Sequence, residues 1–345
     1  MPRAAPKASD LLALNRPRGD EALHLRIGDW TLTVQGLDAS MVSALDRRWG
    51  GFLLDRSSAA ARITLRVFPS GPEGWLERWG KGERYRVEGG IEEDRLVVRS
   101  YHFALCPEEA PRSWRLGLTE QSEEPVERIL DNAVRCLVAR VATEEGGLAL
   151  HGAGVLREGL AYLFAGPSRS GKSTAVRLSS PAVSLGDDYA VLVRGKGGVW
   201  SAPAVPFENT EEAPPRPPQG LLPLAGVWRL FQSAEDRVER PPRGLAIASL
   251  MGCAAFPRAM PDLADAVLDH AKRFVSEAAF AHLHFRKTAD FWKLIEFRGQ
   301  QPKPWRTGVE ALHPCRYGFG CCPRTSCCPR NSMSFQKSAV FRKWR

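Results

Sequence analysis

The sequence lacks any long hydrophobic run. No uninterrupted apolar stretch approaches the roughly 18 residues that a membrane-spanning helix requires. The first ten residues, MPRAAPKASD, contain no apolar segment like the one at the centre of a secretory signal. We therefore expect a cytoplasmic protein with no membrane partner.

Cysteine is scarce over most of the chain. Only Cys106, Cys136 and Cys253 precede residue 300, and their wide separation is typical of a reduced intracellular protein. The other five of the eight cysteines lie in CRYGFGCCPRTSCCPR. Their arrangement as two adjacent pairs differs from the two Cys-x-x-Cys knuckles of a zinc site, so zinc binding is the less favoured alternative for this stretch.

Excess positive charge is nearly absent from the first 295 residues. The formal net charge is +9, but residues 296–345 contain ten Lys or Arg and two Asp or Glu, which leaves about +1 for the remainder. A basic tail is not a basic binding face, so we expect no nucleic-acid partner. Residues 299–345 are predicted to be a disordered, basic, Cys/Pro-rich tail, and the Pro/Ala/Arg-rich residues 1–20 are also predicted to be disordered.

The remaining sequence has a globular balance, because 43% of residues are hydrophobic and 25% are charged. Residues 21–115 contain alternating stretches such as LHLRIGDWTLTVQG and ARITLRVF, which predict strands in a small mixed α/β domain. Residues 116–147 are predicted to form a connecting helix. Its apolar positions recur at steps of three and four: Val126, Ile129, Leu130, Ala133, Val134, Leu137, Val138 and Val141.

The stretch AYLFAGPSRSGKSTAVRL, residues 161–178, has the spacing of a phosphate-binding loop. An apolar strand precedes it and a helix is expected over about 173–178, so backbone N–H groups and the Lys172 ammonium can face a phosphate. The Ser173 hydroxyl can bind Mg²⁺. An ordinary Gly/Ser turn or a degenerate loop is the alternative. The residues predicted to bind the nucleotide are Gly166, Ser168, Arg169, Ser170, Gly171, Lys172, Ser173 and Thr174.

Two acidic residues end another predicted strand, AVSLGDD. In a P-loop fold such a strand lies beside the loop strand, so we expect its carboxyl end, with Asp187 and Asp188, to face the phosphates. One carboxylate can accept a proton from an attacking hydroxyl and the other can hold the metal, with Ser173 and Asp187 as candidate Mg²⁺ ligands. A polar turn is the simpler alternative for the two acids. His151, in LHGAG, ends an earlier strand, and such a histidine on its own is usually structural.

A second histidine pattern lies near the end of the globular part. His282 and His284 alternate on one face of a predicted strand, AHLHFRK, and could form a metal-binding pair. No third ligand is evident, so we favour a structural role for both.

Three stretches together resemble the catalytic domain of the bacterial HPr kinase/phosphorylase family, in particular its short serine kinases. They are LHGAGVLREGLAYLFAGPSRSGKSTAVRL, SLGDDYAVLV and HLHFRKTADFWKLI, within about residues 120–295. The resemblance implies an α/β P-loop domain of the phosphoenolpyruvate-carboxykinase/HPr-kinase type over residues 148–298. It implies an ATP-dependent kinase in which Lys172 and Ser173 bind phosphates and Mg²⁺. Asp187 and Asp188 would supply the base and a metal-associated carboxylate, in either order, and His151 would lie near the γ-phosphate.

One family feature is missing. True HPr kinases carry a later Glu-x-Arg-Gly signature, and the nearest candidate here is Glu208 in VPFENT. We therefore expect the acceptor to be a hydroxyl of unknown identity: a serine of a protein or peptide, or a small molecule. The alternative function is a nucleotide-binding regulator or slow ATPase that transfers no phosphate.

Overall fold

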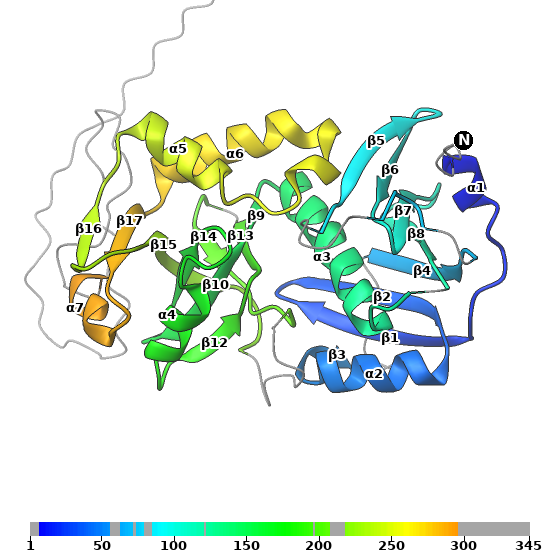
Figure 1. Cartoon of the computed structure of the whole chain (residues 1–345), viewed down its shortest axis with the longest axis horizontal. Helices are drawn as coiled ribbons and strands as arrows, with labels where there is room; N and C mark the ends of the chain where they lie inside the picture. The colour runs from blue at the N-terminus through cyan, green and yellow to red at the C-terminus, as the bar shows by residue number, and fades with distance from the viewer. Residues whose placement is uncertain are drawn as a thin grey trace, which may run out of the picture. The chain divides into compact units, whose positions relative to one another are not determined.

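The computed structural model describes residues 7–55, 63–71, 74–78, 85–120, 122–195, 197–207 and 218–295. Over these residues the fold is mixed α/β, as the sequence predicted, with two sheets and seven α-helices (Figure 1). None of the helices in this part of the chain is long and apolar enough to cross a membrane. The predicted tail at 299–345, with its five cysteines, and Glu208 lie outside the described residues.

The first sheet contains eight strands in the order β3-β1-β2-β4-β8-β7-β6-β5. The β2–β4 and β4–β8 pairs are parallel, and the other neighbours are antiparallel. The strands are β1 (Glu21–Ile27), β2 (Trp30–Leu37), β3 (Leu53–Leu54), β4 (Ile63–Pro69), β5 (Glu88–Glu92), β6 (Arg95–Arg99), β7 (Phe103–Pro107) and β8 (Ser113–Leu118).

The second sheet contains nine strands, seven of them in the order β12-β10-β11-β15-β14-β13-β9. β17 pairs in parallel with β15, on the side of β15 that faces away from β11. β16 pairs antiparallel with β17. The strands are β9 (Leu148–Leu150), β10 (Gly152–Arg157), β11 (Leu160–Ala165), β12 (Val183–Gly186), β13 (Ala190–Arg194), β14 (Trp200–Ala202), β15 (Leu222–Gln232), β16 (Arg237–Glu239) and β17 (Phe280–Phe285).

The helices bury the faces of these sheets. α4 packs against β10, beside it in Figure 1, and against β11, over a core that includes Phe164, Trp228 and Phe285. The helices are α1 (Ala8–Leu12), α2 (Ala39–Trp49), α3 (Val126–Glu144), α4 (Lys172–Leu178), α5 (Arg243–Met251), α6 (Ala264–Glu277) and α7 (Trp292–Ile295), with 3₁₀ turns at Gly50–Phe52, Pro257–Ala259, Pro261–Leu263 and Ala289–Phe291.

Helix α3 connects the two sheets. Seven of its eight predicted apolar positions are buried, and Val126 is half-buried. The helix packs against α2 of the first half and against β9, β13 and α6 of the second. Contacts on several sides also bury Asp131, which forms an ion pair with Arg48 and accepts a hydrogen bond from Trp49 Nε1 at 2.7 Å.

Two predicted boundaries differ from the structure. The predicted limit at 115/116 falls inside β8, which continues to Leu118 because its last residues pair with β7. Residues 1–20 were expected to be disordered, yet Ala8–Leu12 forms α1 and Leu11 is fully buried against the first sheet. Tertiary burial overrides the unfavourable composition there. The division into two separate domains stays a prediction.

The strand that carries the two acidic residues does not lie beside the loop strand, so that expectation was wrong. The Glu158-Gly159 turn folds β10 back along β11 in an antiparallel hairpin, and β10 therefore occupies that side of β11. β12 pairs antiparallel with the outer edge of β10. Because β10 is antiparallel to both neighbours, β11 and β12 run in the same direction. Their carboxyl ends still reach the same edge of the sheet.

Candidate functional site

The glycine-rich loop, residues 166–173, leaves the end of β11 and enters α4. Gly166 has φ +158°, and a Cβ at this position would lie 2.6 Å from Ser170 Oγ. Gly171 has φ +106°, and a Cβ there would lie 2.8 Å from the Phe285 ring. At both positions the backbone conformation disfavours a side chain and the neighbouring atoms leave no room for a Cβ, so the loop requires glycine there.

The tip of the loop is held by its own backbone and by the neighbouring strand. Ser170 N–H donates to the carbonyl of Pro167 at 3.1 Å, and Arg169 between them has φ +66°. The Gln232 side chain, at the end of β15, donates to the Arg169 carbonyl at 2.6 Å. Ser170 Oγ is buried and has no hydrogen-bond partner within the described part of the chain. The loop therefore contains an unused hydroxyl in a fixed backbone.

Lys172 is buried rather than solvated, with only 5% of its side chain exposed. Its Nζ donates to the carbonyls of Gly166 and Pro167 at 3.1 and 3.2 Å and lies 3.0 Å from His151 Nε2. It also lies 3.5 Å from Asp188 Oδ1. A buried ammonium requires such partners, and they fix its position at the mouth of the loop.

His151 and Asp188 form a hydrogen-bonded pair through Nε2 and Oδ1. The His151 backbone is fixed on both sides, because its N–H donates to the carbonyl of Cys253 at 2.7 Å and its carbonyl accepts from Gly166 N–H at 3.2 Å. Burial raises the pKa of Asp188, but the hydrogen bond and charge of His151, with the charge of Lys172, outweigh it and hold this pKa below its ordinary value. Asp188 is therefore a carboxylate at neutral pH.

Asp188 also has an unusual backbone. Its φ is +76°, in the left-handed region that only a few per cent of non-glycine residues adopt. This conformation turns the chain sharply after β12, between Asp187 and the start of β13. Strain of this kind is typical of functional sites, where the surrounding structure holds it in place.

Asp187 contacts a different part of the loop. Ser173 Oγ donates to Asp187 Oδ1 at 3.0 Å, and Ser173 is exposed. A hydroxyl and a carboxylate oxygen are the hard ligands that Mg²⁺ prefers, and Mg²⁺ usually completes its octahedron with water and phosphate oxygens. No group of three or more His, Cys, Asp or Glu side chains in the described ranges could hold a metal by itself. The pair thus suits a metal bound jointly with phosphate.

These side chains surround an open pocket of about 480 Å³. The structure brings the predicted residues together here, with His151 and Asp187 contacting the side chains on its wall. Gln232 and Lys287 also line the pocket and were not predicted. Gln232 is the last residue of β15, the parallel neighbour of β11, and Lys287 lies just after β17, the parallel neighbour of β15. The order of these strands brings both residues to the loop, and the local sequence does not reveal that order. The lining residues are Ser168, Arg169, Gly171, Lys172, Ser173, Thr174, Asp188, Gln232 and Lys287.

Arg135, on α3, is a further charged residue near Asp188, and sequence reasoning missed it. Its guanidinium lies over the Phe207 ring, 5.2 Å from the centroid, and its Nε has no hydrogen-bond partner among the described residues. Burial lowers the pKa of Arg135, while the charges of Asp131 and Asp188 oppose that effect. A residue of the connecting helix, outside all of the sequence motifs, thus adds positive charge near Asp188.

The predicted histidine pair has other partners. His282 Nε2 lies 2.9 Å from Ser249 Oγ, and His284 Nε2 lies 3.3 Å from Glu239 Oε2. Both rings pack on Phe231, each with its centroid 4.9 Å away. These contacts indicate that the two histidines have a structural role in the packing of β17.

Comparison with known proteins gives a partial match. No curated protein matches the chain. Residues 117–281, from the end of β8 to the start of β17, are similar to the family described as SynChlorMet cassette protein ScmC. The matched segment contains His151, the whole glycine-rich loop and both acidic residues, but it ends before Lys287.

Proposed function

We propose that this protein is an ATP-dependent kinase that transfers the γ-phosphate to a hydroxyl group, with an HPr kinase-like P-loop fold. The observation that carries the proposal is the different surroundings of the two neighbouring acids. Asp187 contacts the loop hydroxyl of Ser173, whereas Asp188 contacts Lys172 and His151. Phosphate transfer needs both a metal-associated carboxylate and a proton acceptor, and these surroundings suit the two roles.

The residues present fit a nucleotide and a magnesium ion. The loop backbone at Gly166 and Gly171 leaves no room for side chains, so a phosphate can approach it closely. Ser170 Oγ is a hydrogen-bond donor without a partner in the described part of the chain, and Lys172 supplies a fixed cation at the mouth of the loop. Lys172 would hold the β- and γ-phosphates, and Ser173 with Asp187 would hold Mg²⁺. When bound, the ion neutralises charge on the phosphate oxygens.

Within this proposal, Asp188 acts as the general base. Its ionised Oδ1 would accept the proton of the acceptor hydroxyl as the new oxygen–phosphorus bond forms and the bond to the leaving ADP oxygen breaks. His151 orients the carboxylate through its Nε2, and Lys172 adds positive charge to the same edge of the pocket. The left-handed backbone at Asp188 keeps the carboxylate on the pocket side of the turn.

The acceptor is proposed by chemical class only. The resemblance to short HPr kinase-like proteins favours a serine hydroxyl of a protein or peptide, and a small-molecule alcohol is the other candidate. The pocket is open, so a hydroxyl on a larger chain can approach its edge.

The decisive experiment measures phosphate transfer. The purified chain would be incubated with γ-labelled ATP, Mg²⁺ and a panel of acceptors that contains HPr, serine-containing peptides and small alcohols. We expect labelled acceptor with the wild type and labelling at least about 100-fold slower with the matched variant Asp188→Asn. If the wild type binds ATP but labels no acceptor, the protein is a nucleotide-binding regulator or slow ATPase instead.

A further inference from the structure

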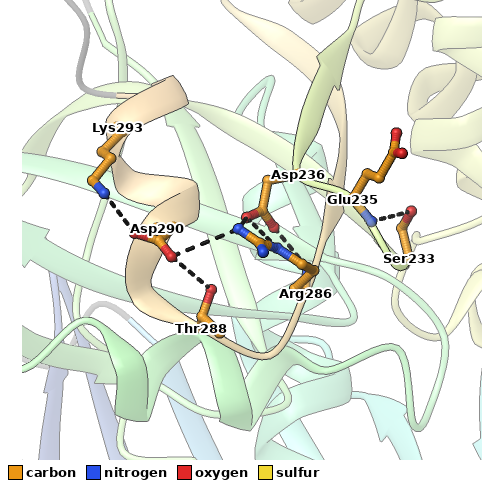
Figure 2. Close-up of polar contacts among 7 residues, drawn as sticks. All are labelled: Ser233, Glu235, Asp236, Arg286, Thr288, Asp290 and Lys293. Carbon is orange, nitrogen blue, oxygen red and sulfur yellow. Dashed lines mark hydrogen bonds and ion pairs between the residues drawn. The ribbon is translucent and has the colours of Figure 1, made fainter.

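The turn between β17 and α7 is anchored on both sides of Lys287. Arg286 N–H donates to Asp236 Oδ1 at 2.6 Å, and its guanidinium donates to Asp236 Oδ2 at 2.8 and 2.9 Å (Figure 2). On the other side, Thr288 Oγ1 donates to Asp290 Oδ2 at 3.4 Å. Asp290 also lies 3.7 Å from Arg286 Nη2, so one network joins both ends of the turn.

The same turn is hydrogen-bonded to the end of β15, the strand whose last residue, Gln232, also contacts the glycine-rich loop. Ser233 N–H donates to the carbonyl of Phe285 at 3.1 Å, immediately before the turn. Gln232, the residue before Ser233, donates to the carbonyl of Arg169 at the loop tip. Two hydrogen bonds from these adjacent residues at the end of β15 therefore hold the turn and the loop tip at a fixed separation.

The contacts that anchor this turn do not involve the Lys287 side chain, which can therefore bind an anion. Its side chain is exposed and lines the same pocket as Lys172 and Ser173. Within the described ranges Lys287 makes no ion pair, although Arg286 and Lys293 on the same turn and helix are both paired with aspartates. An unpaired lysine on a fixed turn is well placed to contact an anion in the pocket.

The charges that line the pocket favour more than one phosphate. Arg169, Lys172 and Lys287 are cationic, and Asp188 is the only acid on the described wall. Asp188 lies within ion-pair distance of Lys172, which leaves Arg169 and Lys287 without a carboxylate partner in the described part of the chain. Two unpaired cations, one in the loop and one in the turn after β17, match a polyphosphate better than a single phosphate.

We propose that Lys287, in the turn after β17, binds a phosphate group of the nucleotide held by the glycine-rich loop. The proposal rests on the proposed function, because it assigns one more residue to the same nucleotide. Lys287 lies outside the segment that matches the ScmC family. The contact would come from the turn after β17, beyond the end of that segment.

The test uses calorimetric titration of the full-length chain with two probes, MgATP and inorganic triphosphate with Mg²⁺. Lys287→Ala should weaken the binding of both probes roughly tenfold, the scale of one charge-assisted hydrogen bond. Lys287→Arg should retain most of the affinity because it keeps the charge. The matched control is Lys293→Ala, which removes a lysine that is 80% exposed and paired with Asp290; we expect a change of less than about twofold.

The outcomes separate this inference from the proposed function. If the wild type binds both probes, Lys172→Ala abolishes binding and Lys287→Ala does not weaken triphosphate binding, the assignment of Lys287 is wrong and the nucleotide site stands. Weaker MgATP binding with unchanged triphosphate binding would also overturn it, since Lys287 would then contact the nucleoside. If the wild type binds neither probe, both proposals fail together.

Discussion

Asp187 and Asp188 are adjacent in the chain but contact different residues of the site. Asp187 accepts from Ser173 at 3.0 Å, while Asp188 pairs with His151 and lies 3.5 Å from Lys172 Nζ. Because the backbone of Asp188 is left-handed, the two carboxylates point in different directions. The pair therefore supplies two different chemical environments within one turn.

This separation predicts different phenotypes for the two amide variants. Asp188→Asn should leave ATP affinity within a few-fold of wild type and lower turnover by about 100-fold or more, the usual scale for a lost general base. Asp187→Asn should instead raise the Mg²⁺ concentration needed for half-maximal turnover, because it removes a metal-binding oxygen. Steady-state kinetics at varied ATP and Mg²⁺ checks both. Identical profiles for the two variants would contradict the assignment of separate roles.

Removal of the loop lysine should abolish nucleotide binding. The structure places Lys172 in contact with four groups, so Lys172→Ala also leaves Asp188 with His151 as its remaining close partner. Asp188 is 36% exposed and can be hydrated, so we expect a loss of only about 1–2 kcal/mol in the free energy of unfolding. Calorimetry with MgATP and urea unfolding measure the two effects. ATP affinity that survives in the folded variant would exclude the phosphate-binding role.

Gly171→Ala should damage both the fold of the loop and its binding. The new Cβ would lie 2.8 Å from the Phe285 ring in a backbone with φ +106°. Gly159→Ala is the matched control, since Gly159 has φ +78° and no atom lies within 4 Å of the position that a Cβ would occupy there. The control should cost about 1–2 kcal/mol of stability through backbone strain alone and keep nucleotide affinity. Equal loss of ATP affinity in the two variants would show that the contact with Phe285 is irrelevant.

The stability of the second half should depend on pH through Glu277. Burial raises the pKa of Glu277, but hydrogen bonds from Arg194 and Trp200 and the charge of Arg194 bring it below its ordinary value of 4.5. A carboxyl whose pKa is lower in the folded state stabilises the protein above its unfolded pKa, and this contribution is lost as pH falls through the folded pKa. The melting temperature of wild type should therefore exceed that of Glu277→Gln at pH 7.

The pH profile is the critical part of that measurement. The difference between wild type and Glu277→Gln should stay constant from pH 7 to about 5.5 and close as the pH falls below about 4.5. Asp269→Asn is the control, because Asp269 pairs with Lys272 on the exposed surface of α6, where solvent screens the pair and we expect only a small difference from wild type at every pH. A difference that widens on acidification would refute the assigned role of Glu277.

The strand, loop and helix around Lys172 could be predicted because each has a local signal: an apolar run, glycines at fixed spacing and a following helical stretch. The burial of Lys172 could not, since it depends on the Gly166 and Pro167 carbonyls and on His151, and the local pattern cannot place these groups. Gln232 and Lys287 were missed for a related reason. Their proximity to the loop follows from the parallel pairing of β11, β15 and β17, strands that are separated by long stretches of sequence.

Two of the differences between the predicted and the observed fold also depend on contacts that the local sequence does not specify. The Pro/Ala/Arg-rich composition of residues 1–20 favours disorder, yet Leu11 finds a buried site against the first sheet. The strand of the two acids was expected beside β11 from the usual strand order of a P-loop fold. The alternation along a strand could not correct this, because it reports which side chains are buried and not which strand pairs with it. Hairpin formation through Glu158-Gly159 decided that pairing in favour of β10.

The insertion of β10 between β11 and β12 has a kinetic consequence. His151 and Gly166 flank a hairpin that pairs Gly152 with Ala165, so these two members of the site come together by closing a short loop. Local pairings of this kind form in microseconds, well before contacts of high sequence separation. Asp188 joins only when β12 docks on the outer edge of the finished hairpin. The phosphate cradle is thus expected to be assembled as a folding nucleus before its acidic partners arrive, and hydrogen exchange during refolding should protect β10 and β11 ahead of β12.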